Sequence, residues 1–250
     1  MKKKKLAFLL AAVLIFSLIL TACGNNNVED AAETEPPEVT QAPSPEPVAT
    51  PTPEPAYLDR FIFVGDANTY GLKYYNMLAD GSATHQVWSP TNGTLEMENI
   101  CDAPIYYPDT EEEMTVSQAA ELKTPDYILL SIGMVGIENA EEDAFKSEYR
   151  SLIKSIQAAS PDTVIICNSI YPVEAGYDEK DNGITNTAID VANIWIAAVA
   201  EETGTVYMDT ASVLKGADGS LIGVYGTGDG VHIAPAGYTE ILKYLNEHPC

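Results

Sequence analysis

Short apolar runs alternate with helical patterns through residues 57–250, and this alternation is the feature that most limits the folds open to the chain. Unbroken apolar runs between turn residues are typical of strands that are buried on both faces of a parallel sheet. Four such runs and a weaker fifth lie at residues 61–64, 127–132, 163–169, 205–208 and 83–88.

Between these runs, apolar residues recur three or four positions apart, as they do on one face of an α-helix. The clearest stripes cover residues 145–156, 188–199 and 238–245, and Gly204 stands where a helix would end. Strands that alternate with helices predict a three-layer α/β/α sandwich with a parallel, doubly wound sheet of about five strands. Ligands bind beyond the carboxyl ends of the strands in such folds, so the loops after the strands are the candidate site.

Four segments in or near these loops carry the residues of interest. They are Gly65-Asp66-Ala67, the loop that reaches Gly93, Gly133-Met134-Val135, and Asp229-Gly230-Val231-His232 before the last helical stripe. Their order and spacing resemble the SGNH/GDSL hydrolases. That family has Gly-Asp-Ser after the first strand, a glycine after the second, Gly-x-Asn after the third, and Asp-x-x-His before the final helix. Asp-x-x-His alone is a weak motif, but its place about 165 residues after Gly-Asp makes the resemblance specific.

The resemblance implies acyl-transfer chemistry. A serine attacks an ester carbonyl, a histidine takes its proton, an aspartate orients the histidine, and N–H groups with an asparagine amide stabilise the oxyanion. By this resemblance His232 matches the base, Asp229 its orienting partner, and Gly93 the glycine donor. Asp66 and Gly133 belong to the loops that would bind the ligand, and Asp66 is also expected to cap the helix that follows it.

Two positions depart from the family pattern. Ala67 stands where the family has its serine, and Val135 stands where it has its oxyanion asparagine. Loss of a triad nucleophile costs a factor of about 10⁶ in rate, and loss of one oxyanion donor roughly 10²–10³. We therefore expect ester hydrolysis by the usual serine route to be near background.

Three hypotheses about function remain open. The first is a degenerate hydrolase that binds a cell-envelope ligand, such as an acylated or acetylated glycan, or a partner protein. The second is an active ester or acetyl hydrolase in which His232 and Asp229 activate water with Asp66, or in which Thr69 or Ser131 is the nucleophile. The third is a surface scaffold, and a cleft filled by Val135, Met134 and Leu95 would favour it.

Aromatic residues near the predicted loops could stack on sugar rings. They are Tyr70, Tyr74, Tyr75, Trp88, Tyr106, Tyr107, Tyr171 and Tyr177. No spacing of cysteine and histidine resembles a zinc site, so we expect neither a metal nor another cofactor. The acidic run 111–113 is expected to begin a solvent-exposed helix.

The first residues resemble a bacterial lipoprotein signal peptide. Four lysines precede an apolar run at 6–20, which is short for a membrane-spanning helix of about 20 residues. Leu20-Thr21-Ala22-Cys23 resembles a lipobox, which implies a diacylglyceryl group on Cys23. We predict a signal peptide at 1–22, a lipid anchor in the outer face of the cytoplasmic membrane, a Pro/Glu-rich linker at 23–56, and one domain at 57–250. An uncleaved anchor helix is the alternative, and it also places the domain outside the membrane.

The chain is strongly acidic. Without the four N-terminal lysines, nine basic residues would face 37 acidic ones. Nucleic-acid binding requires a basic surface, so this composition argues against it. Apart from Cys23, the cysteines are Cys101, Cys167 and Cys250, an odd number that implies no complete set of disulfides.

Overall fold

The computed structural model describes residues 56–180 and 183–250. The predicted signal peptide, Cys23 and the linker lie outside the described residues, except for Ala56 at the linker's end. Among the described helices, none combines the length and the hydropathy needed to cross a membrane.

The core of the domain is a five-stranded sheet in which every neighbouring pair of strands is parallel. The strands lie in the order β2 (Val87–Trp88), β1 (Phe61–Gly65), β5 (Tyr127–Ser131), β6 (Val164–Asn168) and β7 (Val206–Met208). This confirms the predicted α/β sandwich with a parallel sheet of five strands. The weak fifth run is a strand only at its end, because residues 81–83 form a 3₁₀ turn.

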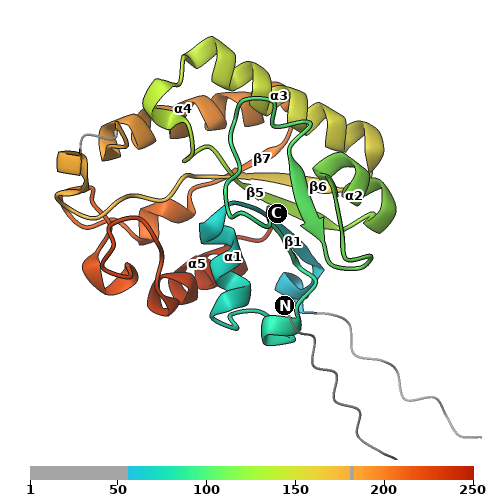
Figure 1. The fold of residues 1–250 in the computed structure, drawn as a ribbon, viewed down its shortest axis with the longest axis horizontal. Helices are drawn as coiled ribbons and strands as arrows, with labels where there is room; N and C mark the ends of the chain where they lie inside the picture. The colour runs from blue at the N-terminus through green and yellow to red at the C-terminus, as the bar shows by residue number, and fades with distance from the viewer. Residues whose placement is uncertain (1–55, 181–182) are drawn as a thin grey trace, which may run out of the picture. The chain divides into compact units, whose positions relative to one another are not determined.

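Helices cover both faces of the sheet, as Figure 1 shows. Alternate side chains of a strand point to opposite faces. Accordingly Ile62 and Val64 pack in one core cluster, while Phe61 and Phe63 pack in the other. The first cluster includes residues of α2 (Val116–Lys123), α3 (Glu142–Ala159) and α4 (Asn186–Thr203), and the second includes residues of α1 (Ala67–Tyr74) and α5 (Pro235–Glu247).

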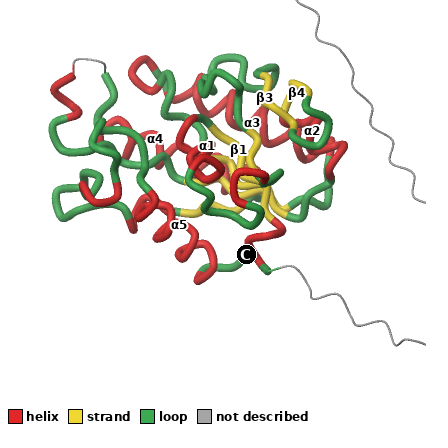
Figure 2. The backbone as a smooth tube through the Cα atoms, turned by 60° about the horizontal axis from the view of Figure 1, so that its bottom comes forward, coloured by secondary structure: helices red, strands yellow, loops and turns green. Residues whose placement is uncertain are grey.

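A second, antiparallel sheet lies between β2 and β5 in the chain. It is a hairpin of β3 (Pro104–Tyr107) and β4 (Glu112–Thr115), which lies beside α2 (Figure 2). The prediction of a helix start at residues 111–113 is wrong. Glu111 has a φ of 60° in the turn, and the two glutamates after it belong to β4. All side chains of β4 are at least partly exposed, so the sequence contains no apolar run that would predict this strand.

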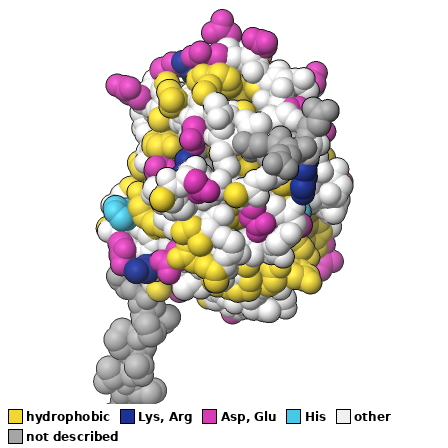
Figure 3. All heavy atoms as spheres, turned by 90° about the vertical axis from the view of Figure 1, so that its left-hand side faces the viewer, with side chains coloured by type: hydrophobic (Ala, Val, Ile, Leu, Met, Phe, Trp, Pro, Cys, Tyr) yellow, Lys and Arg dark blue, Asp and Glu magenta, His cyan; other side chains and the backbone are white. Residues whose placement is uncertain are grey.

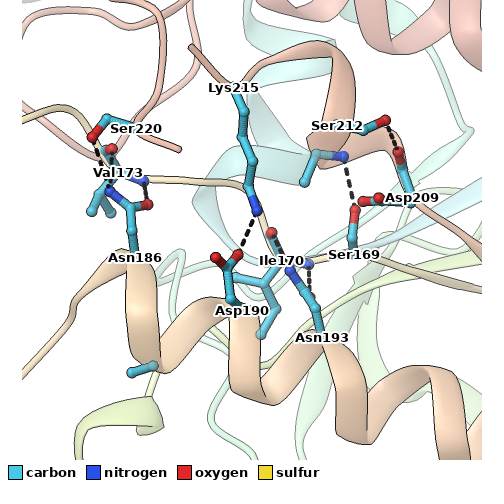
Figure 4. A network of polar contacts seen from close by, with 12 residues as sticks. Ser169, Ile170, Val173, Asn186, Asp190, Asn193, Asp209, Ser212, Lys215 and Ser220 are labelled. Carbon is cyan, nitrogen blue, oxygen red and sulfur yellow. Dashed lines mark hydrogen bonds and ion pairs between the residues drawn. The ribbon is translucent and has the colours of Figure 1, made fainter. Parts of the chain in front are cut away.

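Hydrogen bonds from α4 hold the loop that follows β6 (Figure 4). Asn193 accepts from the N–H of Ile170 at 2.7 Å and donates to its carbonyl oxygen at 3.1 Å. Asn186 makes the same pair of bonds with Val173, both at 3.0 Å. Each asparagine thus pairs with both backbone groups of one loop residue, which fixes the loop at the carboxyl edge of the sheet.

Candidate functional site

His232 and Asp229 form a dyad in the loop before α5. The Nδ1 atom of His232 lies 2.6 Å from Oδ2 of Asp229. The other oxygen, Oδ1, accepts from the backbone N–H groups of Val231 and His232, each at 2.9 Å. Partial burial opposes ionisation of Asp229, but the hydrogen bonds from these N–H groups and from the imidazole outweigh it and hold the pKa of the carboxyl below its usual range. The geometry is that of a carboxylate orienting a histidine.

Asn68 joins the dyad loop to α1. Its Nδ2 donates to the carbonyl oxygen of Val231 at 3.2 Å, and its Oδ1 accepts from the N–H of Ile233 at 3.0 Å. The hydroxyl of Tyr238 donates to the carbonyl oxygen of Asn68 at 2.7 Å. These bonds set the position of His232 against the start of α1. Sequence reasoning missed Asn68, because no motif marks it and its role depends on contacts across more than 160 positions of the chain.

Asp66 caps α1, as predicted. Its side chain accepts from the N–H of Asn68 at 2.9 Å. The residue is only 7% exposed, and this burial raises the pKa of its carboxyl to about 6, although the hydrogen bond from Asn68 and the nearby imidazole of His232 act in the opposite direction. Asp66 therefore contributes both to the helix start and to the charge of the site.

The nucleophile position faces the glycine loop. Ala67 is the first residue of α1, and its N–H donates to the carbonyl oxygen of Gly93 at 3.0 Å. The N–H of Gly93 in turn donates to the carbonyl oxygen of Pro90 at 3.0 Å. Gly93 has a φ of +74°, a conformation that favours glycine. The N–H of Gly93, which the family resemblance offers as an oxyanion donor, and the N–H of Ala67 at the nucleophile position are thus both engaged within the protein.

Ala67, Gly93, Val135 and His232 line one open cavity of about 370 Å³, which we call the central cavity. Asp66, Asn68 and Met134 also line it. Leu95 does not reach it, because that side chain is buried in the core. The cleft is therefore not filled by Leu95, Met134 and Val135 together, and a ligand has room to enter.

The other predicted site residues lie outside this cavity. Gly133 has a φ of +113°, and a β-carbon there would lie 2.9 Å from Cζ of Phe145, so it allows a close approach of the backbone to α3. Thr69 is buried, and its hydroxyl is the one buried side-chain polar atom without a hydrogen-bond partner among the described residues. The hydroxyl of Ser131 accepts from Nδ2 of Asn168 at 3.0 Å. Neither hydroxyl lines the cavity that contains His232.

Comparison with known proteins agrees with this geometry. The model of the GDSL-like Lipase/Acylhydrolase family matches residues 64–239. The chain belongs to this family. A search of curated proteins gave no match.

Solved structures with the same fold are distant in sequence. A candidate platelet activating factor from Streptococcus pneumonia is 21% identical, with a TM-score of 0.56, over 75% of this chain and 82% of that one. A candidate lipolytic protein of the G-D-S-L family from Desulfitobacterium hafniense DCB-2 is 14% identical, with a TM-score of 0.52, over 75% and 97%. The periplasmic domain of a lipopolysaccharide acetyltransferase from Salmonella ser. Paratyphi A is 16% identical, with a TM-score of 0.51, over 75% and 82%. These likenesses show the fold.

Proposed function

We propose that this GDSL-family domain has lost serine hydrolysis and binds an acylated glycan of the cell envelope in its central cavity. The proposal rests on one observation: the positions that the family uses for its nucleophile and its oxyanion donors offer neither in this chain. Ala67 offers no nucleophile, and Val135 offers no amide. The N–H groups of Ala67 and Gly93 are both engaged in backbone hydrogen bonds of 3.0 Å. A tetrahedral oxyanion would find neither of these two N–H groups free and no side-chain amide at position 135.

The features that remain suit binding. A cavity of about 370 Å³ lies at the lower end of the range for small-ligand sites. Val135 and Met134 supply an apolar wall for an acetyl or acyl group, and the imidazole of His232 supplies a polar partner held in place by Asp229. The predicted lipid anchor on Cys23 would hold the domain beside the envelope, which supports a ligand from that source.

The test uses a soluble form of the mature chain, residues 23–250 with Cys23→Ser, which we call the soluble chain. It is incubated with an O-acetylated envelope glycan, the bound glycan is recovered, and its acetyl content is measured by mass spectrometry. We expect binding with the acetyl groups retained, and weaker binding by His232→Ala. Recovery of a glycan that has lost its acetyl groups would overturn the proposal, and so would a glycan that does not bind.

The intact dyad supports a second candidate function, hydrolysis by a water molecule that His232 activates. Its evidence is the 2.6 Å contact between His232 and Asp229 and the position of His232 in the wall of the central cavity. On this account the same incubation releases acetate in an amount that grows with time, and His232→Ala abolishes the release. Acetate release that is unchanged in His232→Ala would exclude this route.

A further inference from the structure

A second cavity adjoins the central cavity on the far side of Ala67. It measures about 330 Å³ and lies between α1 and the segment that runs from β2 to β3. Tyr70 and Lys73 line it from α1, and Pro90 and Tyr106 line it from the other side. Ala67 and Gly93 line both cavities, so the two adjoin at these residues. We call the second cavity the tyrosine groove.

The groove presents aromatic surface to solvent. Tyr70 is 46% exposed, although large apolar side chains are usually covered in a folded domain. Tyr106 is partly buried and comes from a different element, the hairpin strand β3. Two tyrosines from different elements and a proline thus contribute apolar surface to one groove. A ring with apolar faces and polar edges, such as a pyranose, can stack on such a surface.

Lys73 gives the groove a positive charge. Acidic side chains are spread over the face of the molecule in Figure 3, and basic ones are sparse. Most basic residues of the described domain are held by carboxylates. Lys73 has no ion pair and no side-chain hydrogen bond among the described residues, and it is half-buried in the groove wall. Its ammonium group is therefore available to an anionic ligand.

The opposite end of the cleft has the reverse charge. A cavity of about 560 Å³ shares Val135, Gly136 and Glu138 with the central cavity. Five glutamates line it: Glu96, Glu98, Glu138, Glu141 and Glu148. A negatively charged group would be repelled there and attracted at Lys73, so the charge distribution fixes the direction in which an anionic ligand lies.

We propose that the tyrosine groove binds a sugar ring that carries a carboxylate. The ring lies against Tyr70 and Tyr106, the carboxylate lies at Lys73, and the acylated part of the glycan extends past Ala67 into the central cavity. This inference rests on the proposed function, because it names the class of glycan for the same cleft.

The test is an NMR titration of the ¹⁵N-labelled soluble chain. The probe is the disaccharide of N-acetylglucosamine and N-acetylmuramic acid, whose lactyl group carries a carboxylate. The matched neutral probe is N,N′-diacetylchitobiose, which lacks that group. We expect the natural chain to bind the carboxylated probe more tightly than the neutral probe. Tyr70→Leu should weaken the binding of both probes about three- to tenfold. Lys73→Gln should weaken the binding of the carboxylated probe alone, about two- to fivefold.

Two control variants make the same kinds of substitution at residues outside the tyrosine groove. Tyr74→Leu alters a more exposed tyrosine of α1 that does not line the groove, and Lys154→Gln removes an exposed, unpaired lysine on α3. Both control variants should bind each probe with the affinity of the natural chain. The inference is overturned if neither probe binds, or if Tyr70→Leu and Lys73→Gln bind both probes like the controls. The proposed function fails by results of its own assay, in which the O-acetylated glycan either loses its acetyl groups or does not bind, so the two failures can be told apart.

Discussion

The burial of Asp66 predicts that part of the domain's stability is lost as the pH rises. Its carboxyl has a pKa of about 6 in the folded protein against a usual value of 3.8. Between these values the unfolded chain has released the proton while the folded chain still holds it. Rising pH therefore favours unfolding in this window. The contribution of protonated Asp66 to the stability is fully present below about pH 4 and is lost as the pH rises through about 6.

The size of the effect follows from the same two values. Each pKa unit corresponds to about 1.4 kcal/mol, so the shift from 3.8 to about 6 corresponds to about 3 kcal/mol at most. Asp66→Asn removes the ionisation but keeps a good N-cap, since asparagine and aspartate cap helices about equally well. We expect the variant to match the natural chain near pH 4 and to exceed it by up to about 3 kcal/mol at pH 8.

The assay is urea unfolding of the soluble chain and of Asp66→Asn at pH 4, 5, 6, 7 and 8, followed by circular dichroism. Other carboxyls titrate in both proteins, among them Asp109. Burial, the largest single effect there, acts to raise its pKa, but the hydrogen bonds from Lys123, His85 and Tyr107 together outweigh it and lower the pKa to about 2. The contributions of these other carboxyls cancel in the difference between the two curves. A difference in unfolding free energy that stays constant from pH 4 to pH 8 would refute the argument that Asp66 is buried and hard to ionise.

Three further outcomes are expected. Asn68→Ala leaves a carbonyl and an N–H of the dyad loop without partners and should cost about 2–4 kcal/mol in urea unfolding; a loss below about 0.5 kcal/mol would contradict this. Gly230→Ala places a β-carbon 2.3 Å from Cδ2 of Tyr177 at a φ of +100°, so it should destabilise the domain by more than about 1 kcal/mol, measured by thermal unfolding. Cys23→Ser in the full-length chain should move the protein from the membrane to the soluble fraction on ultracentrifugation; retention in the membrane would favour an uncleaved anchor helix.

The sequence predicted the parallel sheet because its central strands are buried on both faces and appear as apolar runs. All residues of β1 are buried, as are the middle three of β5. The β3–β4 hairpin could not be predicted in the same way. Its second strand starts with two exposed glutamates, and a turn residue with positive φ precedes them. The hairpin lies against α2, a contact between separate elements that a local pattern does not contain.

The candidate site was predicted in part. Motif positions identified His232, Asp229, Ala67 and Val135, because the family places chemistry at fixed points of the chain. They did not show that the N–H of Ala67 is engaged by Gly93. That bond joins segments 26 positions apart and depends on the loop conformation at Gly93, which sequence patterns do not specify.

The central claim is that the site around Ala67 cannot hydrolyse esters, and turnover of a short-chain aryl ester tests it most directly. The soluble chain is compared with Ala67→Ser, with Ala67→Ser combined with Val135→Asn, and with His232→Ala. We predict no turnover above background for the natural chain, and turnover that depends on His232 only when Ser and Asn are both restored. Turnover by the natural chain that His232→Ala abolishes would contradict the claim and would show that the domain is an enzyme with a different nucleophile.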